Sequence, residues 1–481
     1  MINSQLFRQK AYIAGEWVES ETGATQSIYN PATGEFLGTV PLLGEEETRK
    51  AIDFSYQAQK DWAAKTAQER SSILRLWYEL MIAHADDLAN ILTLEQGKPL
   101  AEAKGEILYA ASFIEWFAEE GKRIYGDIIP SHKANARLMV LKQPIGVVGA
   151  ITPWNFPCAM ITRKCAPAMA AGCPFIVKPA PDTPFSALAL AVLAEKAGIP
   201  AGIFNVVTGD AVAIGGELTS NDKVKKLSFT GSTAIGKLLM GQCANTVKKV
   251  SLELGGNAPF IIFDDADIES AIEGAMASKF RNAGQTCVCT NRFLVQEGIH
   301  DRFVEKLTQA VESLEVGNGM TQGVSQGPLI NENAILKIED HVQDALAKGA
   351  KLNTGGNRHV LGGTFFEPTV ISDVTPDMKV AKEETFGPLA PIFKFKNESE
   401  ALLMANDSEF GLAAYVYTRD LGRSWRMGEG LEYGMVGINE GIISTTVAPF
   451  GGIKQSGIGR EGSKYGIEDY VEIKYIMVGG I

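Results

Sequence analysis

The chain has 481 residues, more than a single hydrophobic core usually organises, so two or more domains are expected. Hydrophobic residues make up 45% and charged residues 21%, as in an ordinary globular protein. A net charge of -12 argues against a nucleic-acid partner, whose phosphates would be repelled. The first residues contain no apolar run like that of a signal peptide, and the nearly apolar stretch 165–177 is too short to span a bilayer. We therefore expect a cytoplasmic protein without membrane association.

Amphipathic runs such as 73–83 predict that residues 30–125 are mainly helical. Two later segments, 126–143 and 466–478, fit neither of the α/β patterns described next. Residues 466–478 alternate apolar and polar side chains, as an exposed strand does. An edge strand of this kind can pair with another chain, so these segments predict a small element for self-association.

Between residues 145 and 255, short apolar runs alternate with helical patterns, which is typical of a doubly wound, nucleotide-binding sheet. Thr183 and Pro184 supply an N-cap and a first-turn proline for the helix 185–197. A second helix is predicted over 232–243. Strands are predicted over 145–151, 174–178, 203–207, 226–230 and 249–254.

A second α/β run follows, and it predicts another sheet covered by helices. Its strands are predicted over 259–263, 292–296, 390–395 and 412–418, and its helices over 267–280, 300–314 and 333–348.

The six cysteines are not spaced as a disulfide framework or a zinc site, and we expect no metal centre. Cys287 differs from most of them, because it follows a predicted helix in the polar turn Phe280-Arg-Asn-Ala-Gly-Gln-Thr-Cys287. Such a turn exposes a thiol. Small or apolar neighbours indicate buried packing residues at Cys158, Cys165, Cys173 and Cys243.

Upstream, Glu253 stands between two leucines and before a glycine pair in Leu252-Glu-Leu-Gly-Gly256. The leucines should desolvate the carboxylate and raise its pKa, which suits a general base. An exposed thiol and a half-buried carboxylate are the equipment for covalent acyl chemistry, in which one group attacks carbon and the other activates water.

Two further motifs follow predicted strands. Gly231-Ser-Thr-Ala-Ile-Gly236 opens a helix, whose first backbone amides can bind phosphate, although such turns often only cap helices. Pro153-Trp-Asn-Phe-Pro157 forms a rigid polar loop at the carboxyl end of a strand, where α/β proteins bind ligands. No Gly-x-Gly-x-x-Gly fingerprint follows any strand, so the conventional Rossmann motif is absent.

These segments resemble, in order, the signatures of the aldehyde dehydrogenase superfamily, and the resemblance spans almost the whole chain. It implies two doubly wound α/β domains plus a small β oligomerisation element. Residues 1–125 and 144–255 would form the NAD(P)-binding domain, 256–454 the catalytic domain, and 126–143 with 455–481 the oligomerisation element of a homodimer or homotetramer. The remaining matching motifs are Lys178-Pro-Ala180, Glu383-Glu-Thr-Phe-Gly-Pro388 and Pro449-Phe-Gly-Gly-Ile-Lys-Gln-Ser-Gly457.

Within the superfamily, the chain resembles the succinate-semialdehyde dehydrogenases of bacterial 4-aminobutyrate degradation. Arg163, Arg281 and Ser444 carry this resemblance and would bind a substrate carboxylate. The pair Cys287-Val-Cys289 resembles a reversible disulfide found in some members, which makes Cys289 a candidate redox partner. The simpler alternatives are an ion pair for Arg163, a helix cap for Arg281, a loop hydroxyl for Ser444 and a packing role for Cys289.

The resemblance also implies the catalytic roles. Cys287 would attack the aldehyde carbon as a thiolate, although a cysteine with a pKa of about 8.5 needs local help to ionise near neutrality. The Asn155 amide and the Cys287 backbone N–H would stabilise the oxyanion. Glu253 would activate the water that hydrolyses the thioester.

The resemblance further implies NAD(P) as cofactor. Lys178 would bind the ribose or its phosphate, Ser232 the pyrophosphate, and Glu384 with Phe386 the nicotinamide ribose. Family members that prefer NAD tend to carry a glutamate where this chain has Pro181, so NADP is expected as the preferred cofactor and NAD as the alternative. Two features argue against NADP: proline has no hydroxyl with which to bind the 2′-phosphate, and the carboxylate of the adjacent Asp182 would repel it. The cofactor site is expected to include Thr152, Trp154, Gly231 and Leu254 as well.

Three rival functions remain at this stage. The nearest is the same chemistry on another aldehyde, such as glutarate semialdehyde. A coenzyme-A acylating enzyme should lack the hydrolytic base that Glu253 provides. A non-catalytic structural or binding relative would have no use for an intact Cys287, Glu253 and Asn155.

Overall fold

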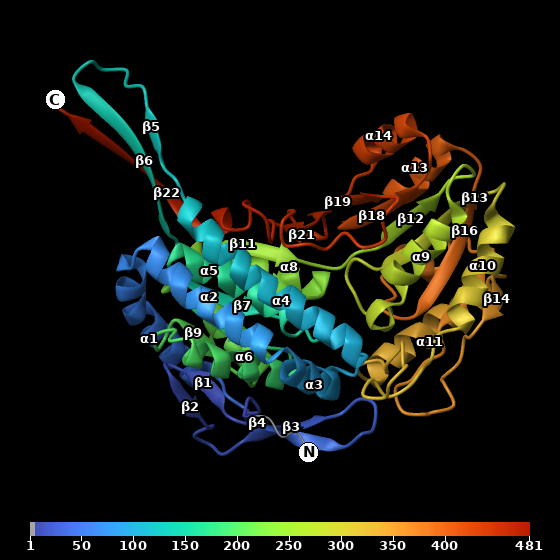
Figure 1. Cartoon of the computed structure of the whole chain (residues 1–481), viewed down its shortest axis with the longest axis horizontal. Helices are drawn as coiled ribbons and strands as arrows, with labels where there is room; N and C mark the ends of the chain where they lie inside the picture. The colour runs from blue at the N-terminus through green and yellow to red at the C-terminus, as the bar shows by residue number, and fades with distance from the viewer. Residues whose placement is uncertain (1–4) are drawn as a thin grey trace.

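The computed structural model describes residues 5–481, which form two α/β lobes and a projecting arm (Figure 1). Each lobe is built on one large sheet, as the sequence predicted. Nowhere in residues 5–481 is there a helix with both the length and the apolar character needed to cross a bilayer.

The sheet of the first lobe has eight strands in the order β2-β1-β9-β8-β7-β10-β11-β21. Its five central strands are parallel, and the predicted alternation with helices over 145–255 is confirmed. The sequence analysis had not predicted α5 or α7. The elements are β7 (Val147–Ile151), α5 (Ala159–Ala171), β8 (Phe175–Lys178), α6 (Pro184–Lys196), β9 (Phe204–Val206), α7 (Ala211–Ser220), β10 (Val224–Thr230), α8 (Thr233–Cys243), η2 (Ala244–Thr246) and β11 (Lys249–Glu253).

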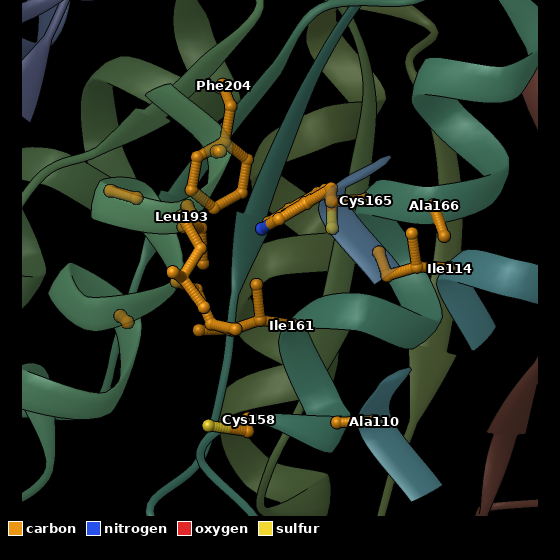
Figure 2. Close-up of a cluster of buried hydrophobic side chains, with 14 of the residues drawn as sticks. Ala110, Ile114, Cys158, Ile161, Cys165, Ala166, Leu193 and Phe204 are labelled. Carbon is orange, nitrogen blue, oxygen red and sulfur yellow. The ribbon is translucent and has the colours of Figure 1, made fainter. Parts of the chain in front are cut away.

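The N-terminal region is mainly helical, as predicted. Its helix α1 packs on β7 and β8, whereas α2, α3 and α4 pack against α5 and α6. Figure 2 shows part of the shared core, to which Ala110 and Ile114 of α4, Ile161 of α5, Leu193 of α6 and Phe204 of β9 contribute. Four short strands near the N-terminus were not predicted. The elements are β1 (Ala11–Ile13), β2 (Glu16–Val18), β3 (Thr25–Tyr29), β4 (Phe36–Pro41), α1 (Glu45–Ala64), α2 (Ala67–Ala83), α3 (Ala85–Gln96), α4 (Leu100–Glu120) and η1 (Gly121–Arg123).

The sheet of the second lobe has seven strands in the order β14-β15-β16-β13-β12-β18-β19, all parallel except β14. All the predicted strands and helices of this lobe are present, and the structure adds eight elements that were not predicted: β14, β15, β17, β19, η3, α12, α13 and α14. The elements are β12 (Ala258–Ile262), α9 (Ile268–Lys279), η3 (Arg281–Gly284), β13 (Thr290–Gln296), α10 (His300–Glu312), α11 (Glu332–Ala347), β14 (Lys351–Thr354), β15 (Thr369–Ser372), α12 (Lys379–Lys382), β16 (Leu389–Phe395), α13 (Glu398–Asn406), β17 (Phe410–Gly411), β18 (Ala413–Tyr417), α14 (Leu421–Gly430) and β19 (Met435–Ile438).

The arm is a three-stranded antiparallel sheet in the order β22-β6-β5, and the C-terminus lies at its tip (Figure 1). Not all of the predicted element 455–481 belongs to it. Residues 457–458 instead pair with Glu253 and Leu252 at the edge of the first sheet. The arm strands are β5 (Asp127–Ile129), β6 (Ala136–Pro144) and β22 (Val471–Gly479). The other elements near the C-terminus are β20 (Ile453–Lys454), which pairs with β17, β21 (Gly457–Ile458), which joins the first sheet, and η4 (Glu468–Tyr470).

The predicted N-cap of α6 is correct in position but wrong in its chemistry. Thr183 is the N-cap residue, yet its side chain makes no capping hydrogen bond. The carboxylate of Glu95 on α3 accepts from the backbone N–H groups of Phe185 and Ser186 at 2.7 and 2.8 Å instead. A carboxylate at a helix N-terminus satisfies free donors and complements the helix dipole. The cap is therefore a tertiary contact, which the local sequence could not reveal.

We expect Glu95→Ala to lower the free energy of unfolding by about 2–4 kcal/mol, because it leaves two buried N–H groups unpaired. Thr183→Ala should stay within about 0.5 kcal/mol, because its hydroxyl has no partner within residues 5–481. Thermal unfolding of the two variants beside the parent checks the difference. Equal shifts for both variants would contradict the assignment of Glu95 as the cap.

Candidate active site

Cys287 is presented by an unusual turn between α9 and β13. Asn282, Ala283 and Gly284 all have left-handed backbone conformations, with φ of 51°, 54° and 72°. Residue 284 must be glycine, because a Cβ there would lie 2.2 Å from the carbonyl oxygen of Gly387. Such strain persists only where the surrounding structure imposes it, and it is common at functional sites. The turn brings Cys287 to a place where two cavities meet.

Both cavities are lined by Cys287, one on each side of the thiol. The first has about 300 Å³ of space, and its lining includes Arg163, Arg281 and Ser444. The second has about 250 Å³, and its lining includes Asn155 and Glu253. The structure thus brings together residues from both lobes that the sequence had singled out separately. The second cavity is also lined by Trp154, Gly231, Ser232, Leu254, Glu384 and Phe386.

Cys287 is partly exposed, as its polar turn predicted, but its thiol is not activated in this state. Burial raises the pKa of Cys287 to about 12, and the guanidinium of Arg163 opposes the shift. The carboxylates of Glu384 and Glu253 reinforce it. The thiol is therefore protonated at neutral pH until a base or a bound ligand changes its surroundings.

Glu253 ends β11 and is only 4% exposed. Its Oε2 is buried and has no hydrogen-bond partner among the described residues. Burial raises the pKa of Glu253 well above its ordinary value, and the nearby carboxylate of Glu461 adds to the shift. The direction of this shift is the one predicted from the flanking leucines, and a raised pKa suits a general base.

Asn155 lies in the loop after β7 and is 3% exposed. Its side-chain Nδ2 donates to the carbonyl oxygen of Gln285 at 3.0 Å, two residues before Cys287. Its backbone carbonyl accepts from Lys98 Nζ at 2.6 Å and from Asn282 Nδ2 at 3.0 Å. The loop after β7 is therefore fastened to the turn that carries the cysteine.

Arg163 lies on α5 and forms an ion pair of 2.5 Å with Glu461, which also accepts from Lys164. The alternative of an acidic partner is thus realised, but Arg163 still lines the first cavity. Its guanidinium lies 3.9 Å from the ring centre of Phe450, which also lines that cavity. Burial by itself would raise the pKa of Glu461, but Arg163 and Lys164 outweigh burial and hold it below its ordinary value.

Several polar groups around the first cavity lack partners. Within residues 5–481, Arg281 makes no hydrogen bond to the end of α9, so a helix-capping role is not seen there. The buried Arg281 Nε, the Tyr109 hydroxyl and the Thr286 hydroxyl are unpaired in the described chain. Buried polar groups are ordinarily hydrogen-bonded. Unpaired donors around a cavity that ends at a cysteine therefore indicate a polar, anionic ligand.

The second cavity has the features of a nucleotide site. Ser232 caps α8 by accepting from the backbone N–H of Ile235, which leaves the first amides of that helix next to an exposed turn. Thr152, which the sequence analysis assigned to the cofactor site, does not line this cavity, and its buried hydroxyl is unpaired among the described residues. Glu384 accepts from the backbone N–H of Gly256 at 3.0 Å, and burial raises the pKa of its carboxyl to about 7.

Aromatic and apolar side chains complete this cavity. The rings of Trp154 and Phe386 meet edge to face with centres 5.5 Å apart. Phe386 has a left-handed φ of 55°, which is strained for a residue with a Cβ. Leu254 packs so closely on Gly236 that a Cβ at residue 236 would lie 2.4 Å from Leu254 Cδ2. The residues present fit a nicotinamide dinucleotide.

Lys178 ends β8 and lies outside the lining of this cavity, near Asp182. Burial lowers the pKa of Lys178 to about 8, and Asp182 and Asp210 oppose the shift. Burial raises the pKa of Asp182, and the positive charge of Lys178 opposes the shift. Because residue 181 is proline, no carboxylate faces Lys178 from that position, and the Pro181 carbonyl accepts from the side chain of Gln26.

Comparison with known proteins agrees with this geometry. The model of the family described as "Aldehyde dehydrogenase family" matches residues 17–476. The chain belongs to the aldehyde dehydrogenase family. It is 66% identical, over 99% of both chains, to the Escherichia coli (strain K12) protein named succinate-semialdehyde dehydrogenase [NADP(+)] GabD. It is 63% identical to a Pseudomonas aeruginosa glutarate-semialdehyde dehydrogenase, covering 100% of this chain and 99% of that one.

A solved structure agrees equally well. The crystal structure of succinate-semialdehyde dehydrogenase from Burkholderia pseudomallei superimposes with a TM-score of 0.99 and 64% identity over 100% of both chains. The predicted aldehyde dehydrogenase fold and enzyme class are confirmed.

Cys289, the suggested redox partner, is fully buried, and both it and Cys287 are free thiols. Its sulfur donates to the Gly284 carbonyl at 3.1 Å, and Lys279 Nζ lies 3.9 Å from it. It lines neither cavity. A disulfide with Cys287 therefore needs a local rearrangement and stays a prediction.

Sequence reasoning missed three charged residues that support this dehydrogenase site. Lys98, Glu106 and Glu461 are 2%, 4% and 5% exposed, and each pairs with an opposite charge. Glu461 follows the last matched motif by four residues, and Lys98 follows Gly97 in a turn between helices. Nothing in the local sequence indicates that these three side chains are buried. Only a search for charged residues close to the recognised motifs could have suggested them.

Proposed function

We propose that this aldehyde dehydrogenase oxidises succinate semialdehyde to succinate with NADP. The observation that carries the proposal is a cavity lined by Cys287 and by two arginines, Arg163 and Arg281. An arginine meets a carboxylate with two parallel hydrogen bonds, which repays the cost of desolvating the anion. The names of the Escherichia coli and Burkholderia pseudomallei relatives support the same substrate.

Glutarate semialdehyde is the second candidate, because the Pseudomonas aeruginosa relative bears that name. It is one methylene longer, and a single methylene changes binding by only about 1–3 kcal/mol. A direct comparison of kcat/KM for the two semialdehydes decides between them.

In this mechanism the Cys287 thiol first loses its proton to solvent, the resulting thiolate attacks the aldehyde carbon, and a thiohemiacetal forms. The second N–H of the Asn155 amide and the backbone N–H of Cys287 stabilise the oxyanion. When bound, the nicotinamide ring supplies the hydride acceptor through which the adduct becomes a thioester. Glu253 then takes a proton from water, the resulting hydroxide attacks the thioester carbon, and the Cys287 thiolate leaves as the acid is released.

The intact base also bears on the rival functions. A coenzyme-A acylating enzyme must preserve its thioester from water, whereas Glu253 stands buried and unpaired at the cavity that Cys287 also lines. A purely structural relative would have no need of a strained turn that holds a cysteine between two cavities.

The arm supports self-association into a homodimer or homotetramer. The edge strand β22 pairs with β6 along its whole length, and apolar side chains remain on the arm surface. Ile128, Ile473 and Tyr475 are 83%, 71% and 57% exposed. Apolar groups on an open sheet favour pairing with a second copy.

Six free cysteines are typical of the reducing cytoplasm, where we place the enzyme.

The covalent mechanism predicts two distinct defects. Cys287→Ala should abolish oxidation while it leaves cofactor binding intact. Glu253→Gln should give a rapid burst of reduced cofactor followed by slow release of acid, because only hydrolysis needs the base. In the parent, hydrolysis should accelerate as pH rises through the raised pKa of Glu253, because the ionised carboxylate is the base. Stopped-flow absorbance of the reduced cofactor measures both phases, and normal turnover in Cys287→Ala would sink the mechanism.

A charged and an uncharged aldehyde should distinguish the roles of Arg163 and Arg281. Arg281→Ala should cost about 2–5 kcal/mol in kcat/KM for succinate semialdehyde, because the substrate carboxylate loses its partner. The same variant should affect butanal, a matched uncharged aldehyde, far less. Arg163→Ala should impair both aldehydes, because Arg163 also holds Glu461. If Arg281→Ala reduces activity on both aldehydes equally, the substrate assignment loses its physical support.

For the cofactor, we expect a higher kcat/KM with NADP than with NAD. Pro181→Glu should reverse this preference by about tenfold or more, since a new charge beside a 2′-phosphate is repulsive. Pro181→Ala is the matched control and should keep it. The preference for NADP should also weaken as pH rises through about 8, where Lys178 loses its proton. A clear preference of the parent enzyme for NAD contradicts the proposal.

A further inference from the structure

A buried ion pair lies directly behind the loop that carries Asn155. Lys98, in the turn between α3 and α4, places its ammonium 2.7 Å from Glu106 Oε2 and 2.6 Å from the carbonyl oxygen of Asn155. The same ammonium lies 3.9 Å from the ring centre of Phe156. The side chains of Lys98 and Glu106 are 1% and 0% exposed.

Glu106 uses both of its carboxylate oxygens. Oε2 accepts from Lys98, while Oε1 accepts from the backbone N–H groups of Cys158 and Ala159 at 3.0 and 3.3 Å. These N–H groups open α5, the helix that carries Arg163. One carboxylate therefore holds Lys98 in place and fastens the end of the same loop to α4.

The Asn155 peptide group is fixed from two sides. Lys98 and Asn282 both donate to its carbonyl oxygen, and its own amide donates to Gln285. Only one of the two side-chain N–H groups of Asn155 has a partner within residues 5–481, so the other remains free for an oxyanion. The position of that free donor depends on how rigidly the peptide group is held.

Stability alone does not explain this arrangement. A buried ion pair loses so much hydration that apolar residues of similar size are often equally or more stabilising. The ammonium also binds a carbonyl of the catalytic loop, which an apolar side chain cannot do. We propose that Lys98, oriented by Glu106, is a positioning residue that sets the Asn155 amide for oxyanion stabilisation. This role rests on the proposed function.

A double-mutant cycle between Lys98→Met and Asn155→Ala tests the role. Lys98→Met should lower kcat by about 100-fold, because a small displacement of a catalytic group has effects of this size. The KM for the aldehyde and the affinity for NADP, measured by fluorescence titration, should change little. In the Asn155→Ala background, the same substitution should change kcat by no more than about twofold, because its target is gone.

Equal losses in both backgrounds would overturn the inference and make Lys98 a merely structural residue. If Asn155→Ala leaves kcat unchanged, the proposed oxyanion role fails, and this inference fails with it. Glu106→Gln keeps one oxygen acceptor for the N–H groups of α5 and weakens the interaction with Lys98. If Lys98→Met does not fold, a double-mutant cycle between Glu106→Gln and Asn155→Ala tests the same role. Lys226→Met removes another buried lysine that lines neither cavity, and it should lower the thermal midpoint without a comparable loss of kcat.

Discussion

The ion pair between Lys98 and Glu106 is the contact on which the arrangement of the active site depends. It joins α4 to the loop after β7 and to the start of α5, so it bears on Asn155 and Arg163 together. Asn282 donates to the same Asn155 carbonyl from the turn that presents Cys287. The two lobes are thereby tied at the point where the chemistry takes place, and neither lobe contains a complete site.

A second buried charge organises the substrate side. The protein carries a net charge of -12, yet the first cavity must accept an anion. Glu461 binds Arg163 and Lys164, and it also raises the pKa of Glu253 through like-charge repulsion. One carboxylate therefore holds Arg163 at the lining of the first cavity and adds to the raised pKa of Glu253. These buried charges interact strongly, because little water lies between them to screen the interaction.

At Cys287, the burial that accompanies a binding cavity works against ionisation of the thiol. Burial beside the two cavities raises the pKa of the thiol to about 12. Arg163 is the cation that opposes this shift most directly, and it is also a candidate partner for the substrate carboxylate. Binding and activation of the thiol are therefore linked through one guanidinium.

The sequence by itself determined the two α/β lobes, the family and the motif residues, because the alternation of apolar runs and the glycine turns are local patterns. It also predicted the raised pKa of Glu253 from its flanking leucines. Only the tertiary structure decided that Glu95, and not Thr183, caps α6, and that residues 457–458 join the first sheet rather than the arm. The same is true of Lys98, Glu106 and Glu461. These residues act through contacts between segments that are distant in the chain, so no local pattern of hydrophobicity or turn residues records them.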